Sequence, residues 1–173
     1  MTKVGWFSAA MGAALVSVAA LLGSTGSASA DPGTIMKFNT MTPVTGPYVG
    51  TANPIRAVPG GGLPWMITAG NGSLKSDGHL LVHVRGLVLA DRAPVPPAQQ
   101  GTNPIPAFRA IVSCQTIGTD GTATVTNVTT DQFPASPEGK ADINTTVSLP
   151  HPCIAPIVFV TSPGSAWFAA TGN

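Results

Sequence analysis

Charged side chains are scarce in this sequence. Asp, Glu, Lys and Arg make up 9% of its 173 residues, and the formal net charge at neutral pH is +1. The few charges are scattered singly, whereas nucleic acids and acidic membrane surfaces bind clustered Lys and Arg side chains. The composition therefore argues against both of these partners. With 43% apolar residues it also argues against disorder, so we expect a folded domain.

Cysteine is nearly absent, because the chain contains only Cys114 and Cys153. No C-x-x-C spacing is present that would indicate a zinc or redox motif. In an exported protein an isolated pair is most simply one disulfide, and the alternative is a reactive or metal-bound pair of thiols. A disulfide here would close a loop of about 40 residues, which stabilises the fold by about 4 kcal/mol on the chain-entropy model.

Helix signals are also lacking after residue 30. No window repeats apolar residues at the helical spacing over three turns, and Pro and Gly recur every few residues. Apolar and polar residues alternate instead, which predicts β-strands. We expect turns at Ser76-Asp77-Gly78 and Thr119-Asp120-Gly121. The expected strands are 36–41, 65–69, 73–75, 79–89, 108–117, 122–130, 141–149, 157–161 and 166–170.

Alternation also assigns one face of each strand to the core. The expected inward residues are Leu80, Val82, Val84, Gly86, Val88, Phe108, Ala110, Val112, Cys114, Ala123 and Val125. Many short strands and no helices predict an all-β protein, a single antiparallel β-sandwich of immunoglobulin-like or jelly-roll-like type with one disulfide. A closed barrel is the main alternative.

Motifs for catalysis and metal binding are missing too. The G-x-S-x-G motif of elbow-type serine hydrolases and the Asp-rich loop of calcium sites do not occur. His79 and His83 lie four residues apart on one strand, about 13 Å, which is too far to share one metal ion. We therefore expect no catalytic, cofactor or metal site. A secreted hydrolase with an unrecognised site is the alternative.

What the sequence does contain is a secretory leader in residues 1–30. Lys3 precedes an apolar stretch from Val4 to Gly23, and Ala28-Ser29-Ala30 follows. A charged tip, an apolar stretch and an A-x-A site are typical of a signal peptide. We expect this segment to enter the translocon as a helix and to be cleaved after Ala30. A retained membrane anchor is the alternative, because the apolar stretch is nearly long enough to span a bilayer.

Residues 31–173 then form the mature protein, a length that suits one β-sandwich domain. Without Lys3 the domain has as many basic as acidic residues. The apolar segment 154–170 is interrupted by Pro156, Pro163 and Gly164, so we expect no membrane span after cleavage and a secreted, extracellular location.

Two groups of residues are candidates for a binding surface. Tyr48, Trp65 and Trp167 are candidates for flat apolar platforms, although core packing is the favoured account of each Trp. If strands 79–89 and 108–117 pair antiparallel, a polar group gathers on one face, although an ordinary solvated face is the simpler interpretation. This group is His83, Arg85, Ser113 and Gln115.

Two long loops, 43–64 and 90–107, exceed the usual length of a connection, and such loops are often functional or disordered.

Several segments resemble small exported proteins common in high-GC Gram-positive bacteria. They are Gly61-Gly62-Leu63-Pro64-Trp65, Val84-Arg85-Gly86-Leu87-Val88, 108–114 and 153–163. The resemblance implies a compartment and a kind of cell but no activity. We therefore expect an exported non-catalytic domain that binds an extracellular protein, a glycan or an envelope surface. A self-associating surface or structural protein is a further alternative.

Overall fold

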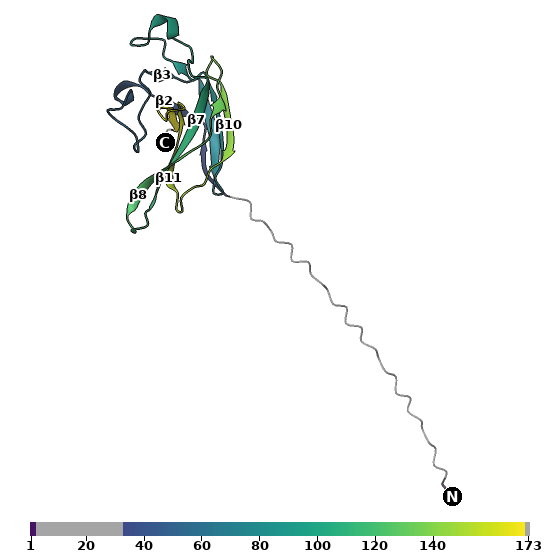
Figure 1. Ribbon diagram of the computed structural model, residues 1–173. Coiled ribbons are helices and arrows are strands. Elements are labelled where there is room, and N and C mark those ends of the chain that lie inside the picture. Colours follow the sequence, from purple (N-terminus) through teal and green to yellow (C-terminus); the bar gives the residue numbers. More distant parts are fainter. Residues whose placement is uncertain (3–32, 172–173) are drawn as a thin grey trace. The chain divides into compact units, whose positions relative to one another are not determined.

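Alternating apolar and polar residues build a fold of antiparallel strands. The computed structural model describes residues 1–2 and 33–171, so the expected signal peptide and its cleavage site lie outside the described residues (Figure 1). Residues 33–171 belong to one compact unit and contain no α-helix. Their only helical turns are two short 3-10 segments, η1 (Gly46–Tyr48) and η2 (Pro97–Gln99).

Two sheets make up most of the fold. A four-stranded sheet has the order β1-β4-β5-β10 and a six-stranded sheet the order β2-β12-β11-β7-β8, with β9 paired to β7. The first contains β1 (Thr34–Phe38), β4 (Ala69–Lys75), β5 (His79–Arg85) and β10 (Ala141–Thr146). The second contains β2 (Met41–Pro43), β7 (Ala107–Ile117), β8 (Ala123–Thr129), β9 (Phe133–Pro134), β11 (Ile154–Thr161) and β12 (Trp167–Thr171). A short pair joins β3 (Trp65–Met66) to β6 (Val88–Leu89).

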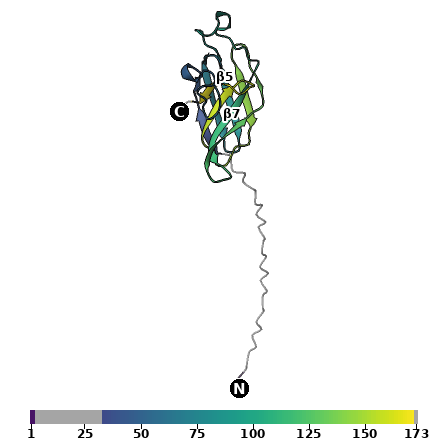
Figure 2. The same cartoon turned by 60° about the vertical axis from the view of Figure 1, so that its left-hand side comes forward.

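The core lies between the two sheets, and strands of both sheets, β5 and β7 among them, overlap in the view of Figure 2. Apolar residues from both sheets contribute to one cluster: Leu80, Val82, Val84 and Ile143 from the first, and Phe108, Val112, Val158 and Val160 from the second. Each of these side chains is at most 1% exposed. The predicted antiparallel β-sandwich is therefore confirmed.

The predicted disulfide is confirmed as well. Cys114 in β7 is bonded to Cys153, and their Cα atoms are 4.9 Å apart. Because Cys153 directly precedes β11, the bond links two neighbouring strands of the six-stranded sheet.

The predicted strand 79–89 is wrong in its second half. It is divided at Gly86, whose φ is +61°, into β5 and β6. Leu87 and Val88 are both buried, so the alternation that should continue through Gly86 and Val88 is lost. A left-handed residue turns the chain out of the four-stranded sheet, which a pattern of apolar residues cannot reveal.

The predicted orientation of β8 is also wrong. Ala123 and Val125 were expected to face the core, but both are exposed. Val128 is opposite Val112, which faces inward, so Val128 packs against the core and Val125 lies on the other face. In a strand made mostly of Thr, alternation gives too weak a signal to choose between the two faces.

The first long loop covers the outer face of the six-stranded sheet. Its backbone bonds to β12 in both directions, with Gly61 N–H donating to Trp167 O at 2.8 Å and Trp167 N–H to Pro59 O at 2.8 Å. Earlier in the same loop, Arg56 Nη1 donates to the Ser113 backbone O at 2.9 Å. Because this loop covers the sheet, the adjacent Trp167 and Phe168 are both buried, on opposite faces of β12.

The second long loop is held by Asn103. Its side-chain Nδ2 donates to Ile105 O and Ser136 O, and its Oδ1 accepts from Ile105 N–H. Leu89 N–H also donates to Thr102 O at 2.9 Å, which fastens the loop to β6. Both loops therefore have defined conformations against the sandwich.

Candidate binding surfaces

The three aromatic candidates occupy different environments. Trp65 and Trp167 are each 3% exposed, so both belong to the core, as favoured from the sequence. Tyr48 is 46% exposed and its ring centroid is 6.4 Å from that of Trp167. Tyr48 thus lies at the surface over Trp167, and the three rings do not form one platform.

The expected polar patch of His83, Arg85, Ser113 and Gln115 is not formed. The pairing on which it depended is wrong, because β5 pairs with β4 and β10 whereas β7 pairs with β11, β8 and β9. His83 and Arg85 lie on the outer face of the four-stranded sheet. Ser113 is fully buried beneath the first long loop, and Gln115 is exposed on the six-stranded sheet.

His83 has a different partner, which the sequence did not indicate. Its Nδ1 lies 2.6 Å from Asp142 Oδ1, because the two residues are directly opposite each other on β5 and β10. The hydrogen bond to His83 is the main cause that lowers the pKa of Asp142, with smaller contributions from the charges of His83, Lys140 and Arg85.

An acid and the histidine that it holds by Nδ1 are two of the three members of a hydrolytic triad. The structure gives His83 Nε2 no serine or cysteine partner in the described part of the chain, and both side chains are widely exposed, at 39% and 52%. The pair therefore has the geometry of a surface interaction.

Other carboxylates lie in turns. The Thr122 backbone N–H lowers the pKa of Asp120, and the Ser136 hydroxyl lowers that of Glu138. Among the described residues no three His, Cys, Asp or Glu side chains are grouped so that they could hold a metal ion.

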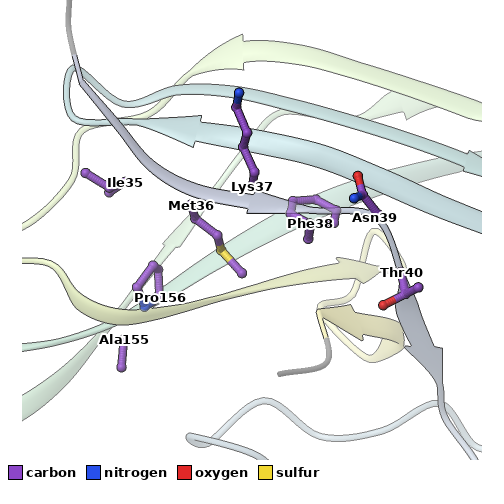
Figure 3. A pocket seen from close by; sticks show the side chains of 8 residues that line it. All are labelled: Ile35, Met36, Lys37, Phe38, Asn39, Thr40, Ala155 and Pro156. Atoms are coloured by element: carbon purple, nitrogen blue, oxygen red, sulfur yellow. The ribbon is translucent and has the colours of Figure 1, made fainter.

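One hollow lies at the flank of the sandwich, where the chain passes from β1 to β2. Its volume is about 550 Å³, and residues 35–40 with Ala155 and Pro156 line it. Figure 3 shows Met36 and Pro156 facing each other across it, whereas Lys37 points away. Little polar side-chain chemistry converges in this hollow, which is a gap between β1 and the irregular start of β11.

A second hollow lies where the two long loops meet, and we call it the loop-end hollow. Its volume is about 320 Å³. Its wall includes the stacked rings of Trp65 and Phe168, whose centroids are 3.9 Å apart and whose planes differ by 21°. The lining residues are Gly62, Leu63, Trp65, Leu89, Gln99, Pro104, Ile105 and Phe168.

The lining is almost entirely apolar. Gln99, in η2, is the single polar side chain among the eight residues. Gly61 packs against the stacked rings, and a Cβ at that position would lie 3.0 Å from the Phe168 ring. Next to it, a Cβ at Gly62 would meet nothing within 4 Å, so this lining position has room for a side chain.

Of the predicted candidates only Trp65 belongs to this hollow. The sequence did not indicate Leu63, Gln99, Ile105 or Phe168, because they come from three separate segments that are joined only by the fold. The available signal was the unusual length of the two loops, which supply five of the lining residues: Gly62, Leu63, Gln99, Pro104 and Ile105.

The fold defines the chain as a disulfide-linked, antiparallel β-sandwich whose two long loops pack against it. No family model, curated protein or solved structure matches it. Within residues 1–2 and 33–171, no helix is long and apolar enough to cross a bilayer.

Proposed function

We propose that this protein is an exported, non-catalytic binding domain that holds the apolar part of an extracellular ligand in the loop-end hollow. The observation that supports this is the hollow itself, where two ordered loops leave an open, ring-walled space. Ligand sites are typically concave and mostly apolar, with a few placed polar groups.

The lining favours one class of ligand over another. A sugar ring is usually held by an aromatic face together with several hydrogen-bonding side chains, but here Gln99 is the single polar side chain. The Trp65 and Phe168 rings are also almost fully buried, at 3% and 4%, so they present an edge rather than a broad face. A ring system or a short hydrocarbon chain fits this wall better than a glycan.

Size sets a similar limit. A volume of about 320 Å³ is at the lower end of the range for small-molecule sites. The occupant is therefore one apolar group of a ligand, and the rest of the ligand extends out of the open hollow into solvent.

Export is supported by the leader pattern of residues 1–30 and by the resemblance to small exported proteins of high-GC Gram-positive bacteria. The disulfide agrees with an oxidising compartment. We place the mature start at Asp31 and the location outside the cell. Intact mass of protein recovered from the culture medium tests this, because a mass that includes residues 1–30 would contradict it.

Binding can be tested with the fluorescent probe 1-anilinonaphthalene-8-sulfonate, whose emission rises in an apolar site. The protein is produced from the full coding sequence and titrated with the probe. We expect saturable enhancement that is weakened in Gly62→Leu, because Gly62 lines the hollow and the backbone there has room for a larger apolar side chain.

Gly33→Leu is the matched control, because Gly33 also has no atom within 4 Å of an added Cβ and does not line the hollow. This variant should bind the probe as the wild type does. Enhancement that is not weakened in Gly62→Leu would place the binding elsewhere and contradict the proposed site.

A further inference from the structure

Apart from the two-residue β9, which pairs with β7 alone, the two sheets of the described chain end in four outer strands, and three of these carry features that hinder pairing with another chain. In the four-stranded sheet, β1 has a register irregularity between Thr34 and Met36 and carries Lys37, and β10 carries Asp142. In the six-stranded sheet, β2 has only three residues and ends in Pro43. Irregularities, charges, prolines and short length are the usual protections of a sheet edge.

The fourth outer strand, β8, has none of these protections. Its seven residues, ATVTNVT, contain no charge, no proline and no glycine. All seven pair with β7 in continuous register, from Ile117 opposite Ala123 to Ile111 opposite Thr129. No strand of the described part of the chain pairs with its other side. Figure 1 shows β8 at the outer margin of the domain.

An exposed apolar patch adjoins this edge. Ile117, Val125 and Ile154 are 51%, 42% and 51% exposed, and they lie on the neighbouring strands β7, β8 and β11. All three line one hollow of about 270 Å³. Gln115 is directly opposite both Ile154 and Val125, which places the two apolar residues on one face.

We propose that β8 pairs antiparallel with β8 of a second copy of this chain, about a two-fold axis at Thr126. This pairing places Thr126 opposite Thr126 and Val125 opposite Asn127, and it joins the two six-stranded sheets into one. Residues that are opposite each other lie on the same face. The Val125 side chains of the two copies therefore become diagonal neighbours, and the two apolar patches meet across the axis.

The absence of charge is the reason for choosing a second copy as the partner. A two-fold axis places each residue of β8 opposite a residue of β8 in the second copy. A charge on the strand would therefore be repeated on the facing strand, close to the first charge. The strand carries none, and the domain from residue 31 onward has as many basic as acidic residues. Long-range repulsion between copies is therefore small, and no charge on β8 selects a different partner.

The test is sedimentation velocity of the exported protein, from low micromolar to millimolar concentration. We expect the mass to double with concentration for the wild type. Thr126→Lys should remain a monomer, because it sets two ammonium groups against each other at the axis. Thr146→Lys is the matched control, since Thr146 is an exposed threonine on the outer strand β10, and it should dimerise like the wild type.

A wild type that stays monomeric throughout, or a Thr126→Lys variant that still dimerises, would overturn the proposal. Val125→Lys gives a second test at a side chain that is already 42% exposed, so it does not depend on how the fold tolerates Lys at position 126. Self-association is independent of the loop-end hollow, so Gly62→Leu should leave it unchanged.

Discussion

In the described part of the chain, three buried polar atoms on the outer face of the six-stranded sheet have no hydrogen-bond partner: Arg109 Nε, Ser113 Oγ and Trp167 Nε1. A buried hydroxyl without a partner costs about 1–3 kcal/mol of desolvation. We therefore expect Ser113→Ala to leave the free energy of unfolding unchanged or to raise it by up to about 1 kcal/mol. Denaturant unfolding followed by circular dichroism measures this.

Thr130→Val is the contrasting variant. Thr130 Oγ1 accepts from Ala110 N–H at 3.0 Å and donates to Asp131 O at 2.7 Å. Removal of the Thr130 hydroxyl leaves the buried Ala110 N–H without this acceptor and should lower the free energy of unfolding by about 1–3 kcal/mol. If Ser113→Ala were as destabilising as Thr130→Val, Ser113 Oγ would have a hydrogen-bond partner, and the claim that this hydroxyl is buried without one would be wrong.

The Asp142–His83 pair should make stability depend on pH. A carboxyl pKa that is lower in the folded than in the unfolded state stabilises the fold above the ordinary value of 3.8. This stabilisation disappears as pH falls through the lowered pKa. The midpoint of thermal unfolding should thus fall more steeply below about pH 5 for the wild type than for Asp142→Asn.

The effect on the midpoint is expected to be small, because both side chains are widely exposed. Parallel acid profiles for the two proteins would show that the His83 hydrogen bond does not influence stability.

Individual residues were predictable where β-branched and aliphatic side chains alternate without interruption. Leu80, Val82 and Val84 were placed in the core from the pattern alone, and each is at most 1% exposed. The same reasoning failed at Val125. Its strand consists mostly of Thr, which fits either face, so only the register with β7 decides which residues are buried.

At the scale of elements, Gly86 separates β5 from β6. Its φ is +61°, and a Cβ would overlap the Thr68 side chain. Gly86→Ala therefore combines backbone strain with a steric conflict, and we expect a loss of about 2–4 kcal/mol. Chemical denaturation of the purified protein measures it.

Gly121→Ala isolates the backbone contribution. Gly121 has φ +79°, but nothing lies within 4 Å of an added Cβ, so a loss of about 1–2 kcal/mol is expected. Equal losses in the two variants would show that contact with Thr68 plays no part in ending β5.

Strand pairing could not be derived from the pattern of single strands. Both β5 and β7 alternate clearly, and pairing them in one sheet was consistent with their sequences. The two strands in fact lie in opposite sheets. β5 is flanked by β4 and β10, whereas β7 is flanked by β11 and β8. Which strands pair depends on packing between segments that are distant in the sequence. One such segment is the long connection from β6 to β7, whose conformation the strand pattern does not predict.

At the scale of the whole molecule, the sandwich and its disulfide followed from the sequence because they rest on composition and on a single pair of cysteines. The loop-end hollow did not follow. Its wall combines a loop glycine and leucine, a strand tryptophan, a 3-10 glutamine and a phenylalanine near the end of the chain. Neither spacing nor local pattern relates these residues.

The central claim is that the loop-end hollow is the binding site, and the indole N–H resonances test it most directly. In a ¹H–¹⁵N spectrum of the labelled exported protein, Trp65 reports on the hollow, and Trp167 on the opposite face of the six-stranded sheet. We predict that the anilinonaphthalene probe shifts the Trp65 indole resonance progressively and leaves that of Trp167 unchanged. A shift of Trp167 alone, or of neither resonance while the probe fluoresces, would contradict the account.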